Sequence, residues 1–88
     1  MKVALNMTKN ERQIIENEVN RLIERMDRRE VRQAKAEEEG DIAKVRLCER
    51  NDLRDMAKLD GIDFVLGYLG FRRKWDAENN RCVIYKID

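Results

Sequence analysis

Residues 59–75 read LDGIDFVLGYLGFRRKW, and the spacing of apolar residues changes within this segment. Before it, apolar residues recur every three or four positions, which is the period of a helix, among many charged residues. After it, apolar and polar residues alternate, which is the period of a strand. We therefore expect the core to form where a long helix ends and a small sheet begins.

Length and composition favour one small domain spanning residues 1–88. The chain has 88 residues, of which 42% are charged and 6% aromatic, so its core is thin. A formal net charge of +1 excludes a global field that would attract DNA or an anionic membrane. No apolar run reaches the ~18 residues of a membrane span, and the start MKVALNM is too short for a signal peptide. We predict a cytoplasmic protein.

The first helix is predicted to begin at Thr8, because Thr8 and Glu11 have the spacing of a capping box. Beyond Met26 the apolar stripe thins to Val31, Ala34 and Ala36, and Gly40 is a plausible stop. A stripe wider than one partner helix covers predicts a homodimer, in which two copies form a helical bundle. The predicted dimer interface consists of Ile14, Ile15, Val19, Leu22, Ile23 and Met26.

The second helix is predicted to run from Ile42 to Leu69, with Asp41 as its N-cap and Gly70 as its left-handed C-terminal stop. The helical arm would then cover about residues 8–69. The predicted inward stripe consists of Val45, Cys48, Asp52 or Leu53, Met56, Leu59, Ile62, Leu66 and Leu69.

Two strands, residues 71–75 and 82–87, should form a β-hairpin head at about residues 71–87. Asn79 and Asn80 between them tolerate the positive φ of a tight turn. The alternation in Lys2–Met7 predicts a short N-terminal strand or an unpaired tail. The expected fold is therefore α+β: a long antiparallel two-helix hairpin, coiled-coil-like, followed by a C-terminal β-hairpin.

Catalysis has little support in the sequence. The chain lacks histidine, the usual general base near neutral pH, and its glycines do not form a phosphate-binding loop. Cys48 and Cys82 are interpreted as reduced core residues rather than nucleophiles. The aspartates Asp52, Asp55, Asp60 and Asp63 alternate with basic residues, so they are interpreted as a solvated, ion-paired face rather than a metal site. We expect no enzyme, no cofactor and no metal.

Two basic rows and an aromatic cluster are the strongest signals of binding. All five aromatic residues lie between Phe64 and Tyr85, more than so small a head can bury. We predict a partner-binding site at Tyr68, Arg72, Arg73, Lys74 and Trp75. The basic rows are Arg21, Arg25, Arg28, Arg32 and Lys35 on the first helix, and Arg46, Arg50, Arg54 and Lys58 on the second. Solvated faces, protein contact and nucleic-acid contact all remain open for these rows.

The C-terminal third resembles small proteins encoded by phages and prophages of Gram-positive bacteria. The resemblance rests on Leu66, Leu69, Gly70 and Phe71 at the end of the helix, and on the Trp75-Asp76 step of the strand. It implies a non-enzymatic protein that binds a host or defence protein, as anti-CRISPR proteins do. The leading hypothesis is therefore a stoichiometric inhibitor of a larger protein, such as a CRISPR effector nuclease. The alternatives are a nucleic-acid-binding accessory protein that uses Arg72, Arg73, Lys74 and Trp75, and a structural coiled-coil assembly protein.

Overall fold

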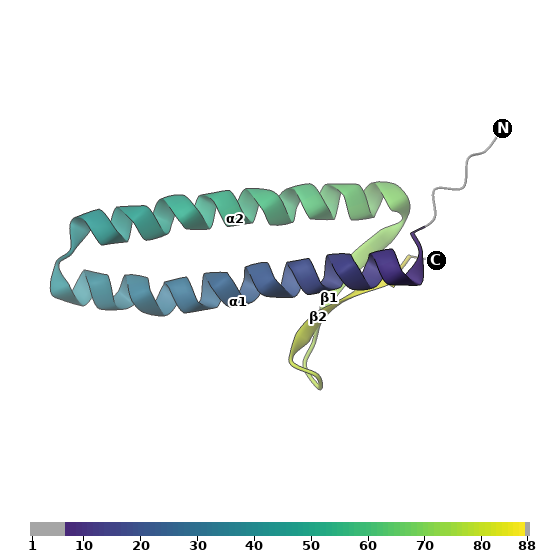
Figure 1. The fold of residues 1–88 in the computed structure, drawn as a ribbon, viewed down its shortest axis with the longest axis horizontal. Coiled ribbons are helices and arrows are strands. Elements are labelled where there is room, and N and C mark those ends of the chain that lie inside the picture. Colours follow the sequence, from purple (N-terminus) through teal and green to yellow (C-terminus); the bar gives the residue numbers. More distant parts are fainter. Residues whose placement is uncertain (1–6, 88) are drawn as a thin grey trace.

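The computed structural model describes residues 7–87. Two long antiparallel helices are followed by a two-stranded antiparallel sheet, which confirms the predicted fold class (Figure 1). The predicted N-terminal strand lies outside the described residues, except for Met7. The elements are α1 (Lys9–Glu39), α2 (Ile42–Leu69), β1 (Phe71–Asp76) and β2 (Arg81–Lys86).

Local capping chemistry sets the ends of both helices. Thr8 Oγ1 accepts a hydrogen bond from Glu11 N at 3.1 Å, and Glu11 Oε1 accepts one from Thr8 N at 3.1 Å, which completes the predicted capping box. The Asp41 side chain accepts from Lys44 N and so caps α2. Gly40 and Gly70 end the helices at φ 69° and φ 84°, where glycine carries no Cβ strain.

The helices pack along a seam whose head half is apolar. Val19 and Leu22 of α1 are almost completely buried against Leu59 of α2 and Cys82 of β2. Next to them, Leu66 of α2, Phe71 of β1 and Ile84 of β2 form a second buried cluster. We call the end of the hairpin that carries the sheet the head, and the end at Gly40 the handle. The core therefore lies in the head, as expected.

The handle half of the seam buries charged residues beside Ala36 and Cys48, which corrects the predicted stripes. On α2, Leu53 is 69% exposed and Met56 51% exposed, whereas Asp55 is only 2% exposed. Inward positions on α2 recur at strict steps of three and four, and this spacing leads through Asp52 and Asp55 rather than Leu53 and Met56. Asp55 is therefore not part of a solvated face.

A matching correction applies to the handle half of α1. Val31 is 72% exposed and Ala34 is exposed, although both were predicted to extend the apolar stripe. Ala36, also predicted, is buried at 1% exposed, and the other buried position beyond Met26 is Arg29, which is 6% exposed. The inward face of α1 therefore continues beyond Met26, but through the buried charged residue Arg29.

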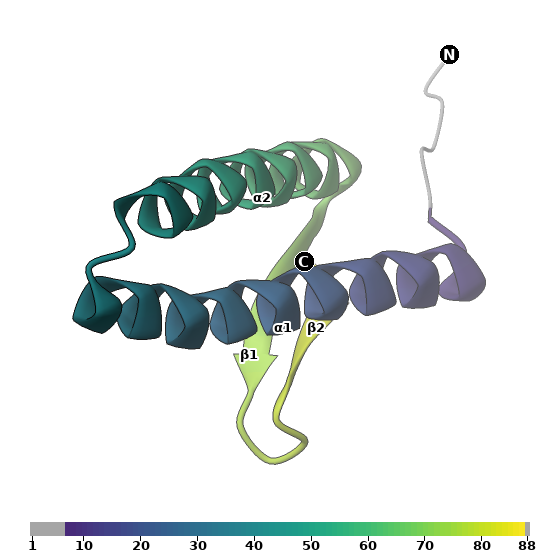
Figure 2. The same ribbon diagram turned by 60° about the vertical axis from the view of Figure 1, so that its left-hand side comes forward.

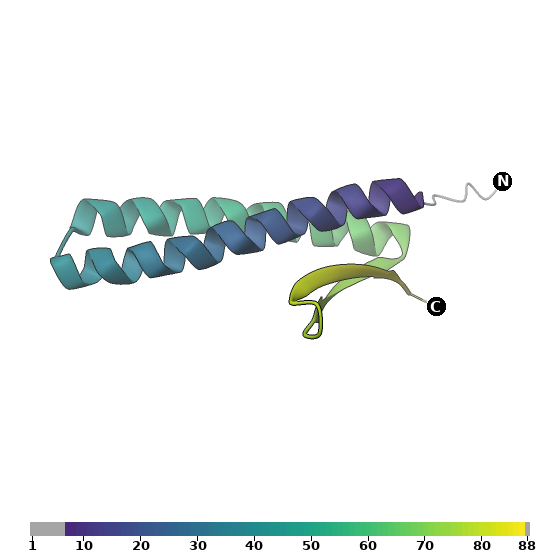
Figure 3. The ribbon, with the colours of Figure 1, turned by 60° about the horizontal axis from the view of Figure 1, so that its bottom comes forward.

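The sheet lies on one face of the helical pair, at the head (Figures 2 and 3). Phe71 pairs with Lys86 and Asp76 with Arg81, and Asn80 in the connecting turn has the predicted positive φ, 51°. Cys82 and Ile84 point inward and are buried, whereas Tyr85 lies on the outer side. Within residues 7–87, neither helix combines the length and apolar character that crossing a membrane requires.

Candidate functional site

The structure assigns Arg73, one of the predicted partner-binding residues, to an internal contact. Its Nε donates to Asp63 Oδ1 at 2.6 Å and an Nη donates to Asp63 Oδ2 at 3.0 Å. These hydrogen bonds raise the pKa of Arg73 above its ordinary value. Arg73 is half-buried. It therefore fastens β1 to α2 and has little capacity left for a partner.

The other predicted residues of this site lie on different surfaces. Arg72 and Lys74 are exposed on the outer side of the sheet, with Lys74 Nζ 5.2 Å from the centre of the Tyr85 ring. Trp75 is 52% exposed and lines a polar groove against α1. Tyr68 is 74% exposed on α2, on the side away from α1. They do not form one site.

The predicted dimer interface is largely used within the chain. Val19 and Leu22 are 0% and 1% exposed, so neither offers surface to a second copy. Ile15, Ile23 and Met26 pack partly against the same cluster. Ile14 alone among the six residues is a strongly exposed large side chain, at 59%. Homodimerisation stays a prediction, but this stripe cannot form its centre.

An apolar groove of about 500 Å³ lies between α1 and α2 in the head. Glu16 and Asn20 of α1 contact β2, whereas Ile14 and Glu18 line the groove, on the opposite side of the seam. The groove therefore opens on the face opposite the sheet. Its lining residues are Ile14, Ile15, Glu18, Leu22, Lys58, Gly61, Ile62, Val65 and Leu66.

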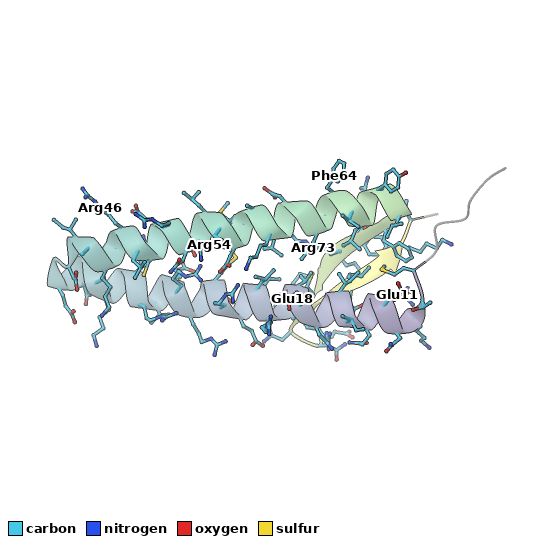
Figure 4. All side chains as sticks on the ribbon, turned by 45° about the horizontal axis from the view of Figure 1, so that its top comes forward. Glu11, Glu18, Arg46, Arg54, Phe64 and Arg73 are labelled. Carbon is cyan, nitrogen blue, oxygen red and sulfur yellow. The ribbon has the colours of Figure 1, made fainter. Side chains whose placement is uncertain are left out.

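Part of each basic row continues from this groove towards the handle. By helical periodicity, Arg28 and Arg32 of α1 turn towards the face opposite the sheet, and Arg54 and Lys58 of α2 turn the same way. All four are exposed. Arg21, by contrast, lines the groove that Trp75 of the sheet forms against α1. Figure 4 shows that Phe64 and Arg46 project from α2 on the side away from α1. The face combines an apolar groove at the head with positive charge along the handle.

Acidic residues of α1 lie on the opposite side from these rows. Helical periodicity turns Glu24, Asp27 and Glu30 towards the side of α1 that carries the sheet. Near them, Glu16 accepts from Arg81 at 3.4 Å and from Ile84 N at 3.0 Å. The net charge of +1 therefore conceals an uneven distribution, in which Glu18 is the acidic residue of the groove lining and pairs with Arg21 at 2.9 Å.

A buried ion-pair network crosses the seam in the handle. Arg29 donates to Asp52 and to Asp55, each at 2.7 Å, and Arg25 makes two hydrogen bonds to Asp55 at 2.8 and 3.1 Å. Burial favours a raised pKa for Asp55, but hydrogen bonds from Arg25 and Arg29 outweigh it and hold this pKa below its ordinary value. Every charged group of the network has a partner, so the network is structural.

Sequence reasoning did not single out Arg29. The steps of four and three that run from Ile15 to Met26 reach Arg29 next, so the signal was present. It was missed because the stripe was followed only through apolar residues. Cys48 and Cys82 are buried and free, as interpreted, and no group of metal-ligating side chains occurs in the part of the chain that the structure describes. No protein-family model, curated protein or solved structure matches this chain.

Proposed function

We propose that this protein is a small, non-enzymatic binding module that occupies a surface of a larger protein. The observation that carries the proposal is the apolar groove beside Ile14 and Val65, on the face opposite the sheet. Ile14 is 59% exposed and Val65 51% exposed, in a chain of which 42% is charged. Exposed apolar side chains around a groove are typical of protein-interaction sites.

The charges around the groove indicate the chemistry of the partner. Lys58 lies in the groove lining, and Arg54 lies one helical turn before it on the same face. An amphipathic helix with apolar anchors and acidic flanks fits such a surface, because its anchors fill the groove and its carboxylates pair with the basic rows. A second copy of this chain fits poorly, because stacking two such faces brings basic rows together.

The resemblance to phage and prophage proteins suggests which partner to test first. A bacterial defence nuclease, such as a CRISPR effector, is the leading target class, and stoichiometric inhibition is the leading mode of action. The basic rows also support nucleic-acid binding as the alternative. The aliphatic side chains that form most of the groove offer nothing to a phosphate backbone, so we favour a protein partner.

The test is a pull-down from a lysate of the native host, with mass spectrometry of the bound proteins and titration of the candidate. Val65→Glu should weaken binding by ~2 kcal/mol or more, as the loss of a central anchor does. Leu53→Glu is the matched control, because Leu53 lies on the same helix, is 69% exposed and is not part of the groove lining.

Two results would contradict the groove as the binding surface. The first is that Val65→Glu binds like the wild type while Trp75→Ala, on the sheet, does not. The second is affinity that falls steeply with salt, by ~0.9 log units per log unit of salt for each neutralised phosphate, which indicates duplex DNA. Nuclease treatment of the lysate before the pull-down separates direct protein contact from contact through nucleic acid.

A further inference from the structure

The main-chain groups at the two outer edges of the sheet differ in their hydrogen bonding. Side chains of α1 cover the edge of β2: Cys82 N donates to Asn20 Oδ1 at 2.7 Å, and Asn20 Nδ2 donates to Cys82 O at 2.8 Å. Two residues further on, Ile84 N donates to Glu16 Oε2 at 3.0 Å. An exposed strand edge is a template for another strand, and here a helix supplies the missing partners for β2.

The register shows which main-chain groups of β1 form the other edge. Ile87 N donates to Gly70 O at 2.8 Å, and hydrogen-bonded pairs alternate along an antiparallel ladder. The main-chain amides and carbonyls of Gly70, Arg72 and Lys74 therefore point towards β2. The amides of Phe71, Arg73 and Trp75 point outwards, to the open edge of the sheet. The outward amides of β2 deduced in this way are those of Cys82, Ile84 and Lys86, and α1 binds the first two.

The edge of β1 has no such cover in the part of the chain that is described. The sheet of residues 7–87 contains two strands, and no side chain there hydrogen-bonds to the amides of Arg73 or Trp75. In Figure 2, β1 is the strand nearer the handle. A hollow of about 430 Å³ lies beside its first half, lined by residues that include Asp63 and Gly67.

The charges on β1 select which strand can be added. Arg72 and Lys74 are exposed on its outer side. If two copies paired their β1 edges antiparallel about Arg73, Arg72 of each copy would lie opposite Lys74 of the other. Like charges directly opposite one another destabilise a pair of strands, so a second copy is disfavoured. An acidic strand is favoured, because its carboxylates would lie opposite Arg72 and Lys74 and pair with them.

We propose that the outer edge of β1 binds an extended, acidic segment of a partner protein by strand addition. Backbone hydrogen bonds to Arg73 and Trp75 supply the affinity, and Arg72 and Lys74 supply the preference for acidic side chains. The Arg73 side chain is bound to Asp63 and so holds β1 in place, while its backbone amide faces the added strand. This surface is distinct from the groove between the helices, which lies on the opposite face, so the proposal does not depend on the groove.

The first experiment measures amide hydrogen exchange of the free protein by NMR. The amides of Cys82 and Ile84 should be protected, because Asn20 and Glu16 accept from them. The amides of Arg73 and Trp75 should exchange ~10-fold faster or more, since nothing in the described chain accepts from them. Equal protection of the two edges would show that the β1 edge is already covered, and would overturn the proposal.

The second experiment adds peptides as long as β1. A peptide of alternating Glu and Val should slow exchange at Arg73 and Trp75, and a peptide of alternating Lys and Val should not. The double variant Arg72→Glu/Lys74→Glu should reverse this preference, with its fold checked by unchanged chemical shifts of Leu22 and Leu66. Arg46→Glu/Arg50→Glu, with the same change of charge at exposed positions on α2, is the control and should leave the preference unchanged. An unaltered preference in the β1 variant would overturn strand addition at this edge.

A backbone variant separates the amide from the side chain. Trp75→Ala removes the indole and keeps the outward amide, whereas Trp75→Pro removes both. Proline is tolerated at an edge position whose N–H faces solvent. Binding of the acidic peptide should therefore fall further in Trp75→Pro than in Trp75→Ala. Equal binding by the two variants, with both folded, would show that no hydrogen bond forms at this amide.

Discussion

The two halves of the seam between α1 and α2 both join the helices, one through aliphatic packing and the other through buried ion pairs. In the head, Val19 and Leu22 of α1 are buried against Leu59 of α2. In the handle, the equivalent positions hold Arg29 and Asp55, which are 6% and 2% exposed. One half excludes water with aliphatic side chains, and the other buries charges that must all be paired.

The difference concerns specificity more than stability. Aliphatic side chains at regular spacing can pack in more than one register, whereas an arginine between two carboxylates has one arrangement that satisfies its donors. Taking two charges out of water costs several kcal/mol, and the attraction between them roughly offsets this cost. We infer that the head supplies the stability of the hairpin and that the ion pairs in the handle select its register.

The largest effect should follow from breaking the network at Asp55. Asp55→Ala leaves Arg29 buried without its main partner, so the free energy of unfolding should fall by ~3–5 kcal/mol. Chemical denaturation of the variant measures this loss. Asp60→Ala, at an exposed position on the same helix, is the control and should change stability by less than ~0.5 kcal/mol.

The double variant Arg29→Leu/Asp55→Leu sharpens the comparison. It gives the handle the chemistry of the head, so it should recover most of the loss or exceed the wild type. If register is what the ion pairs supply, this variant should also show more than one set of amide signals by NMR. A single sharp set would mean that the head alone fixes the register.

A smaller effect of the same network should appear in the pH dependence. The pKa of Asp55 is depressed in the folded chain, because hydrogen bonds from Arg25 and Arg29 outweigh the effect of burial. Its contribution to stability is therefore fully present above the unfolded pKa of Asp, ~3.9, and is lost as pH falls through the lower folded value. Melting temperatures should drop below about pH 4 in the wild type, and less steeply in Arg29→Leu/Asp55→Leu.

The smallest effect concerns two glycines of the head. Gly70 has φ 84°, so Gly70→Ala should cost ~1 kcal/mol or more through backbone strain. Gly61 lies inside α2, and a Cβ there would meet no atom within 4 Å. Gly61→Ala should therefore be neutral or stabilise the chain, by up to ~1 kcal/mol. Equal shifts in melting temperature would contradict this assignment of the end of α2.

Local sequence chemistry predicted the elements well and the site poorly. The capping box at Thr8, the two glycine stops and the asparagine turn depend on residues within a few positions of one another. The bounds of α2 were therefore predicted correctly. The inward face of the handle was predicted wrongly, because Leu53 and Met56 are apolar and Asp55 is charged. Only the arginines of α1, far away in the sequence, make Asp55 a better inward residue.

The candidate surfaces show the same limit. Arg73 and Trp75 were predicted to bind one partner because they are neighbours in sequence. The fold turns Arg73 to Asp63, and it makes the backbone edge of β1, which no side-chain pattern reveals, the open part of the sheet. The groove beside Ile14 and Val65 joins residues from two helices that are separate in the sequence.

The sequence by itself determined where each helix begins and ends, where each strand lies to within a residue, and that the core lies at one end of the hairpin. These features follow from hydrogen bonds and steric preferences between neighbouring residues, and from the spacing of apolar side chains. Tertiary structure decided which charges are buried, which strand edge is covered and which face carries the groove. Each of these depends on contacts such as Arg29 with Asp55 or Asn20 with Cys82, and long-range pairing alone brings such residues together.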